Sequence, residues 1–246
     1  MISFIIPAYN EERLIGRTLA AIQSAARELD LRYELIVVDD GSTDGTVAAA
    51  LANGARVVTV RFRQISRARN AGARAAVGDT LIFVDADTIV PAATVRAALE
   101  ALARGAVGGG AAVEFDGGLP LWATVVAAAI AGVMRAARLA AGCFVFCSRA
   151  AFDASGGFPE HIYAGEELFF SRALSRQGRF VILRESVVTS ARKVRTHDWS
   201  DMLRLCGGFM RRGTGMLRSR DRLALWYDGR RDDPGPKRDR KDTRAA

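Results

Sequence analysis

The chain has 246 residues, half of which are hydrophobic, and a formal net charge of +8. This length suits one large domain or two small ones, and the apolar share is sufficient for an extensive core. The positive charge favours an anionic partner, such as nucleic acid, a phosphate-bearing substrate or an acidic membrane surface, without choosing among them. Cys143, Cys147 and Cys206 are too few and too irregular for a disulfide framework, and no CxxC spacing offers a zinc site.

Apolar runs of strand length alternate with helix-length segments in the first part of the chain. Strands are expected at residues 2–6, 35–38, 56–60 and 81–84. Helices are expected at residues 11–29, 46–52 and 66–76. This alternation indicates an α/β fold with a mostly parallel, Rossmann-like sheet that carries helices on both faces. Ligands of such sheets bind beyond the carboxyl ends of the strands.

The second part of the chain is less regular. After Pro91 a helix is expected through Ala103, and the stretch "GAVGGGAAVEF" predicts a turn that leads into another strand. Residues 119–134 are apolar, but Arg135 ends the run before the roughly 20 residues that a membrane span needs. We expect a helix there that is either buried or lies at an interface. Residues 228–246 mix charges of both signs with Pro and Gly, which predicts a disordered tail.

The N-terminus predicts a cytoplasmic location. The stretch "MISFIIPAYNEE" has neither the positive start nor the long apolar segment of a secretory signal, because Pro7 and Asn10 end the apolar run. The low cysteine content agrees with a reducing compartment. We expect the three cysteines to be packing residues.

Paired acids follow the second expected strand. Asp39 and Asp40 would repel one another unless a donor-rich partner compensates them, and the hydroxyl and N–H groups of a nucleoside are such a partner. Helix capping is the alternative explanation for Asp44 in the same turn. The motif "PAYNEE" has two readings as well: a nucleoside-binding loop, or a helix start capped by Asn10.

A second acidic pair, Asp85 and Asp87, follows the strand at residues 81–84. In an extended chain, residues two apart point to the same side, and two carboxylates there suit a hard cation such as Mg²⁺ or Mn²⁺. Capping of the next turn by Asp87 or Thr88 is the alternative. On the helix before this strand, "ISRARNAGARAAVGD" carries several arginines, and we select Arg69 to bind a diphosphate by paired hydrogen bonds.

Five motifs together identify a resemblance. "IIPAYNEE", "VVDDGSTDGT", "ARNAGARAAVGDTLIFVDAD", "GGFPE" and "GEELFFSRAL", in this order and spacing, resemble a family 2 glycosyltransferase of the GT-A fold from about residue 2 to residue 174. The resemblance implies an inverting enzyme that takes a sugar from a nucleoside-diphosphate sugar. It further implies a divalent metal, Mg²⁺ or Mn²⁺, and a carboxylate that activates an acceptor hydroxyl. The acceptor is a glycan, a lipid-linked molecule or a small molecule.

The resemblance also assigns roles to individual residues. Asp85 and Asp87 would hold the metal, and His197 is a candidate for a further ligand. The family's second acidic motif is usually Glu-Asp, whereas this chain has Glu166 and Glu167, of which Glu167 is the expected base. Acids that open a helix at residues 166–177 are favoured by the helix dipole in any case. The residues expected to bind the nucleotide sugar are Pro7, Ala8, Tyr9, Glu11, Asp39, Asp40, Arg69, Asp85 and Ala86.

This assignment divides the chain into a glycosyltransferase domain at residues 1–227 and the tail at 228–246. Residues 1–110 would form its nucleotide-binding half and residues 111–227 its acceptor side. The basic, partly apolar stretch 189–220 reads either as an amphipathic element on an anionic membrane or as a solvated helix face.

Two other function classes remain open at this stage, a nucleotidyltransferase and a sugar-nucleotide or glycan-binding module without turnover. A nucleotidyltransferase usually has a Gly-rich phosphate loop after its first strand, and "PAYNEERLIG" is not one. Nucleic acid is not an expected partner, because the aromatic residues are not interleaved with the basic clusters.

Overall fold

The computed structural model describes residues 1–117 and 121–192. The expected tail, His197 and most of the basic stretch 189–220 lie outside the described residues. The strands are β1 Ile2–Ala8, β2 Tyr33–Asp39, β3 Arg56–Thr59, β4 Thr80–Val84, β5 Thr88–Ile89, β6 Ala106–Phe115, β7 Phe144–Ser148 and β8 Arg179–Thr189. The helices are α1 Ile15–Glu28, α2 Thr46–Ala52, α3 Ile65–Ala75, α4 Ala92–Ala103, α5 Leu121–Ala136, α6 Arg149–Ser155 and α7 Glu166–Ser175.

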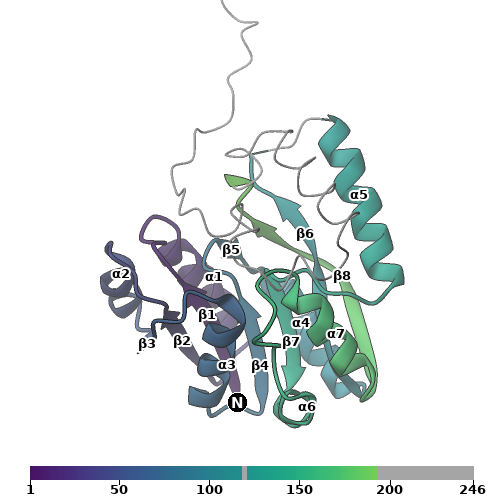
Figure 1. The fold of residues 1–246 in the computed structure, drawn as a ribbon, viewed down its shortest axis with the longest axis horizontal. Coiled ribbons are helices and arrows are strands. Elements are labelled where there is room, and N and C mark those ends of the chain that lie inside the picture. Colours follow the sequence, from purple (N-terminus) through teal and green to yellow (C-terminus); the bar gives the residue numbers. More distant parts are fainter. Residues whose placement is uncertain (118–120, 193–246) are drawn as a thin grey trace, which may run out of the picture.

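The strands of the described residues form one eight-stranded sheet in the order β3-β2-β1-β4-β7-β6-β8-β5 (Figure 1). Strands β1 to β4 are parallel, and β8 is parallel to β6. Strand β7 is antiparallel to both of its neighbours, and β5 is antiparallel to β8. The mostly parallel α/β sheet predicted from the sequence is therefore confirmed, and β6 continues across the expected division at residue 110.

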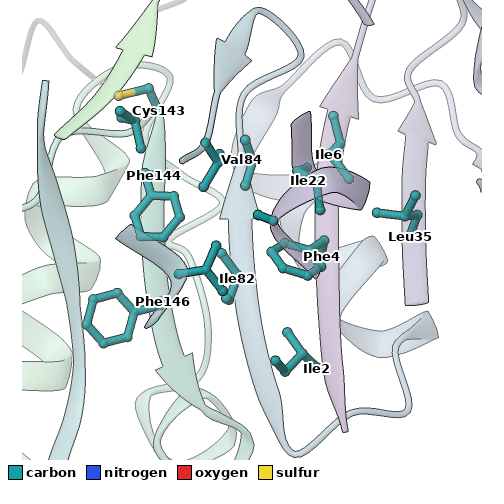
Figure 2. Close-up of a cluster of buried hydrophobic side chains, with 14 of the residues drawn as sticks. Ile2, Phe4, Ile6, Ile22, Leu35, Ile82, Val84, Cys143, Phe144 and Phe146 are labelled. Carbon is teal, nitrogen blue, oxygen red and sulfur yellow. The ribbon is translucent and has the colours of Figure 1, made fainter. Parts of the chain in front are cut away.

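Alternating side chains of the strands fill two hydrophobic cores, one on each face of the sheet. Figure 2 shows Ile2, Phe4 and Ile6 of β1 on one face, together with Ile22 of α1. Helices α1 and α4 cover this face, whereas α3, α6 and α7 contribute Ala68, Phe152 and Phe170 to the other. This alternation is the reason why apolar strand runs in the sequence predicted helices on both faces. Cys143 and Cys147 are buried and pack in these cores, as expected.

The first helix begins later than the sequence predicts. Asn10 has a positive φ of 52° and does not cap a helix, and α1 starts at Ile15. The reason is a set of contacts with the loop after β2: the N–H of Asn10 donates to Ser42 Oγ at 3.0 Å, and that of Glu11 donates to Thr46 Oγ1 at 2.7 Å. Residues 9–14 thus form a loop above the sheet edge, and the capping reading of Asn10 is wrong.

Helix α5 is exposed at several apolar positions, although its sequence allowed a buried helix. It stands to one side of the sheet, beyond β6 and β8 in the view of Figure 1. Among its described side chains Ala129, Ala131 and Val133 are exposed, Val133 by 68%. Of the two expected environments, buried or at an interface, the buried one therefore does not hold for these positions. Within the residues that the structure describes, no helix is both long and apolar enough to cross a membrane.

Gly72 permits a close approach of α3 to the sheet, and this contact can be tested. A Cβ at this position would lie 2.4 Å from Ile5 Cγ2 and 2.8 Å from Val38 Cγ2, both in the core. We expect Gly72→Ala to lower the free energy of unfolding by about 1–3 kcal/mol, because the helix must move off β1 and β2. Urea unfolding followed by circular dichroism measures this loss.

Gly132→Ala is the matched control, because Gly132 is also helical but its Cβ would meet nothing within 4 Å. The better helix propensity of Ala predicts no loss of stability there. Equal effects of the two substitutions would contradict a tight contact at Gly72.

Candidate active site

The carboxyl ends of β1, β2 and β4 meet at one edge of the sheet. In the parallel register Ala8 of β1 pairs with Asp39 of β2, and the N–H of Asp40 donates to the carbonyl of Ala8 at 2.9 Å. Strand β4 lies on the other side of β1 and ends directly before Asp85. The "PAYNEE", "DDGS" and "DAD" motifs therefore lie at the same edge, because the parallel strands before them have the same direction.

Asp40 finds its donor-rich partner within the protein. Its carboxylate accepts hydrogen bonds from the backbone N–H groups of Phe62, Arg63 and Gln64, the last two at 2.8 and 2.9 Å, and the residue is buried. These three residues lead directly into α3. Asp40 therefore stabilises the start of that helix, and a carboxylate with three N–H donors does not need a nucleoside for compensation.

Asp39 and Tyr9 belong to the same edge of the sheet as Asp40. The N–H of Ser42 donates to Asp39 Oδ1 at 3.2 Å. The guanidinium of Arg63 lies over the ring of Tyr9, 3.4 Å from its centroid. Such stacking presents a flat surface next to a carboxylate, which suits a nucleobase and its ribose.

Arg69 of α3 is the centre of the buried polar network. Its Nη1 donates to Glu166 Oε1 at 2.7 Å, and its Nη2 donates to Asp85 Oδ1 and to the carbonyl of Gly142, each at 2.8 Å. Its side chain is only 1% exposed. Burial by itself would lower the pKa of Arg69, but the charges of Asp85 and Glu166 outweigh it and raise this pKa. The guanidinium that the sequence suggested for a diphosphate is thus engaged with protein carboxylates.

The two acids that open α7 have different environments. Glu166 is buried and shares its carboxylate with Arg69. Glu167 is half-buried, and its carboxyl lies near Gly142, where a Cβ would meet it at 3.4 Å. Burial and then the charge of Glu166 raise the pKa of Glu167 to about 8, against the opposing charge of Arg69. Glu167 is therefore the acid of this pair whose proton can be exchanged near neutral pH.

Asp87 is held from the other side of the site. Arg192, which follows β8, donates from Nη2 to both carboxylate oxygens of Glu11 at 2.8 and 3.0 Å, and the same nitrogen lies 3.5 Å from Asp87 Oδ2. Thr189 Oγ1 donates to Asp87 Oδ1 at 3.4 Å. The network around Asp87 therefore joins the first loop of the chain, the Asp85-Ala86-Asp87 stretch, called the DxD motif below, and the end of the sheet.

Helix α3 also holds the loop after α6. Asn70 Nδ2 donates to the carbonyl of Phe158 at 2.9 Å, and its Oδ1 accepts the N–H of Phe158, also at 2.9 Å. Gln64 Nε2 donates to the carbonyls of Glu160 and Ile162. This loop belongs to the acceptor side that the resemblance implies for residues 111–227, and we call it the expected acceptor loop. It is thus attached to the same helix that carries Arg69.

The oxygen donors of Asp85 and Asp87 fit a hard divalent cation. Arg69 uses only Oδ1 of Asp85, whose side chain is 27% exposed, and Oδ2 makes no hydrogen bond to a described residue. The described residues contain no group of three or more His, Cys, Asp and Glu side chains placed to hold a metal. Two carboxylates need further oxygen ligands, and phosphate and water oxygens are the usual ones for Mg²⁺. The expected third ligand, His197, lies outside the described residues.

The remaining predicted residues line or support this edge. Pro7 and Ala8 belong to β1, where Ala8 is buried. Ala86 is also buried, and its carbonyl accepts the hydroxyl of Thr18 at 2.9 Å. Sequence reasoning did not find Arg192 or Gly142. Neither has a local signal, because an isolated Arg after a strand or a Gly before one is common.

Arg69 gives a direct stability prediction. We expect Arg69→Met to lower the free energy of unfolding by about 3–5 kcal/mol, because it leaves the buried Glu166 and the partly buried Asp85 without their counter-charge. Arg67→Met is the matched control on the same helix: Arg67 pairs with Glu160 at 3.6 Å, and both side chains are 45% exposed. Its loss should stay below about 1 kcal/mol. Guanidinium chloride unfolding at pH 7 measures the free energy of unfolding of both variants. Similar losses in the two variants would contradict the claim that Arg69 is the centre of the buried network.

Comparison with known proteins supports the arrangement of the sheet. A mannosyltransferase from Pyrobaculum calidifontis, solved with GDP-Man and Mn²⁺, superposes with a TM-score of 0.67 at 21% identity and covers 88% of this chain and 62% of that one. Glucosyl-3-phosphoglycerate synthase from Mycobacterium tuberculosis gives a TM-score of 0.61 at 24% identity, over 93% of this chain and 80% of that one. These likenesses confirm the GT-A fold.

Sequence comparison gives the family. An undecaprenyl-phosphate 4-deoxy-4-formamido-L-arabinose transferase from Aeromonas hydrophila is 34% identical over 117 residues, which are 43% of this chain and 34% of that protein. The chain thus matches about a third of the length of such curated relatives. The model of the family described as glycosyl transferase family 2 matches residues 3–152, more than half of the chain. The protein therefore belongs to glycosyl transferase family 2.

Proposed function

We propose that this protein transfers a sugar, with inversion at the anomeric carbon, from a nucleoside-diphosphate sugar to an acceptor hydroxyl. The proposal rests mainly on the guanidinium of Arg69, which pairs with two acids at once. Its Nη2 lies 2.8 Å from Oδ1 of Asp85 in the DxD motif, and its Nη1 lies 2.7 Å from Oε1 of Glu166 in α7. A candidate cation ligand and the candidate base pair are thus kept together at one edge of the sheet. Single displacement needs both at the same reacting centre.

The donor side of the site is assigned to the loops after β1 and β2. The stacked pair of Tyr9 and Arg63 faces the nucleobase, and Asp39 accepts from the ribose hydroxyls. Asp85 and Asp87 would hold Mg²⁺ or Mn²⁺, and the Mn²⁺ complexes of the two structural relatives agree with this choice. When bound, such a cation neutralises charge on the departing diphosphate. In this proposal Asp40 has a structural role and does not touch the nucleotide.

The acceptor side is assigned to α7 and the loop that α3 holds. Glu167 takes the proton of the acceptor hydroxyl, and Glu166 remains paired with Arg69 and orients the start of α7. The raised pKa of Glu167 makes it a stronger base than an exposed carboxylate, once it is ionised. Its carboxyl group lies against Gly142, where a Cβ would be in van der Waals contact with it.

A second candidate acceptor is a lipid phosphate. It is favoured by the curated relatives, whose names give undecaprenyl phosphate as their lipid. The exposed apolar positions of α5 and the arginines at its end, Arg135 and Arg138, agree with a peripheral position at the cytoplasmic face of a membrane. A phosphate acceptor is already ionised at neutral pH and needs no base.

Asp87→Ala tests the cation site. We expect it to reduce kcat at least about a hundredfold, because the leaving diphosphate loses its charge stabilisation. Purified protein with Mn²⁺ is supplied with nucleotide sugars, and release of the nucleoside diphosphate is measured.

The control is Asp79→Asn, whose carboxylate is 91% exposed and contacts only the N-terminus at 3.3 Å among the described residues. It should retain full activity. Full activity of Asp87→Ala would contradict the assignment, and release of pyrophosphate in place of nucleoside diphosphate would indicate nucleotidyl transfer.

The pH dependence of transfer separates the two acceptors. Because the pKa of Glu167 is raised to about 8, its basic form increases as pH rises through 8. For a hydroxyl acceptor, kcat/KM for the donor should therefore rise with pH and level off above about 8, and Glu167→Gln should abolish the rise and most of the activity.

With a lipid phosphate, whose second proton leaves near pH 6, Glu167→Gln should retain most of the transfer. If Glu167→Gln also retained its activity with every hydroxyl acceptor, Glu167 would be excluded as the base.

A further inference from the structure

Arg192 is buried at the donor edge of the site, although it lies 181 positions from its main partner, Glu11. Its side chain is 5% exposed, and those of Glu11 and Asp87 are 8% and 12% exposed. Its Nη2 donates to both carboxylate oxygens of Glu11 and lies 3.5 Å from Asp87 Oδ2. Arg192 is therefore a buried positive charge that these two acids share.

The sheet determines this position of Arg192. Strand β5 follows Asp87 directly and pairs with the end of β8, with Thr88 opposite Thr189. The hydroxyl of Thr88 donates to that of Thr189 at 3.1 Å, and Thr189 also contacts Asp87. Because Arg192 follows three residues after Thr189, the pairing delivers it to the DxD motif. The position of Arg192 is thus fixed by strand pairing, unlike that of an isolated Arg on the surface.

Asp87 Oδ2 has two competing uses. In the structure it faces Arg192, and in the proposed function it is an oxygen ligand of the divalent cation. A guanidinium and a divalent cation on the same carboxylate repel each other strongly in a buried site. One of them must give way, unless an anion such as a diphosphate lies between them.

From this geometry we infer that Arg192 is a donor-binding residue that stands in for the cation beside Asp87 until a nucleoside diphosphate arrives. The diphosphate then accepts hydrogen bonds from the guanidinium and replaces the ion-pair contact with Asp87, while the pair with Glu11 persists. The cation consequently binds together with the nucleotide and not before it. This inference rests on the proposed function and adds an order of binding to it.

Mn²⁺ binding to the full chain without nucleotide provides the test. Free Mn²⁺ is quantified by electron paramagnetic resonance for the wild type and for Arg192→Gln. We expect Arg192→Gln to bind Mn²⁺ roughly tenfold more tightly or better, because a competing charge leaves and two acids lose their counter-ion. In the wild type, UDP or GDP should tighten Mn²⁺ binding, and the same nucleotide should help Arg192→Gln much less.

Arg61→Gln is the matched charge control. Arg61 is exposed beyond the end of β3, near Gly41 of the same edge, and its side chain forms no ion pair with a described residue. Its Mn²⁺ affinity should stay within about twofold of the wild type, because exposed charges are screened by solvent. If Arg192→Gln does not fold, Arg192→Lys is measured in its place. A single ammonium holds Asp87 less well, so Mn²⁺ should again bind more tightly.

Mn²⁺ affinity that is unchanged or weaker in the Arg192 variant would overturn the inference. The proposed function is judged separately, by sugar transfer of the wild type. If the wild type transfers sugar while the variant shows no tighter Mn²⁺ binding, the proposed function stands and the role of Arg192 falls. If the wild type neither transfers sugar nor binds a nucleoside diphosphate, the proposed function itself fails.

Discussion

A guanidinium buried between two carboxylates is the interaction on which the site depends. Without Arg69, Asp85 and Glu166 would be like charges in a poorly solvated position, and one of them would have to take up a proton or move apart. With Arg69 in place, each acid has a partner at less than 3 Å, and the carbonyl of Gly142 accepts from the same nitrogen as Asp85. The ion pairs therefore set the relative positions of β4 and α7, which are separated by about a third of the chain in sequence.

Helix α3 brings this guanidinium to the site and is itself held at several points. Asp40 binds the backbone that leads into the helix, and Gly72 lets it approach the side chains of β1 and β2. Asn70, one residue after Arg69, holds Phe158 through both of its amide groups. One helix thus links the loop after β2, the DxD strand and the expected acceptor loop. This arrangement relates stability to function, because a shift of α3 would separate the proposed donor and acceptor sides together.

The sheet and most helices followed from local patterns, whereas the network did not. Apolar runs predicted the first four strands to within two residues at each end, and α2 was predicted at its observed bounds. The start of α1 was predicted too early, because the N–H groups of Asn10 and Glu11 donate to the side chains of Ser42 and Thr46. These acceptors lie after β2, far from α1 in the sequence. Glu166 lies 97 positions from its partner Arg69, and Glu11 lies 181 positions from its partner Arg192. The periodicity of apolar residues contains no information about pairs that are so far apart. Sequence motifs therefore indicated which residues gather at the edge, but not which of them neutralise one another.

The effect of Glu166→Gln on the free energy of unfolding, measured in two backgrounds, tests the central claim most directly. With Arg69 present, the substitution removes one of its two charged partners and should destabilise the protein by about 1–3 kcal/mol. In an Arg69→Met background the same substitution removes one of two uncompensated acids and should stabilise the protein. This reversal of sign is the predicted result. A loss of the same size in both backgrounds would show that Glu166 does not depend on Arg69 and would contradict the account.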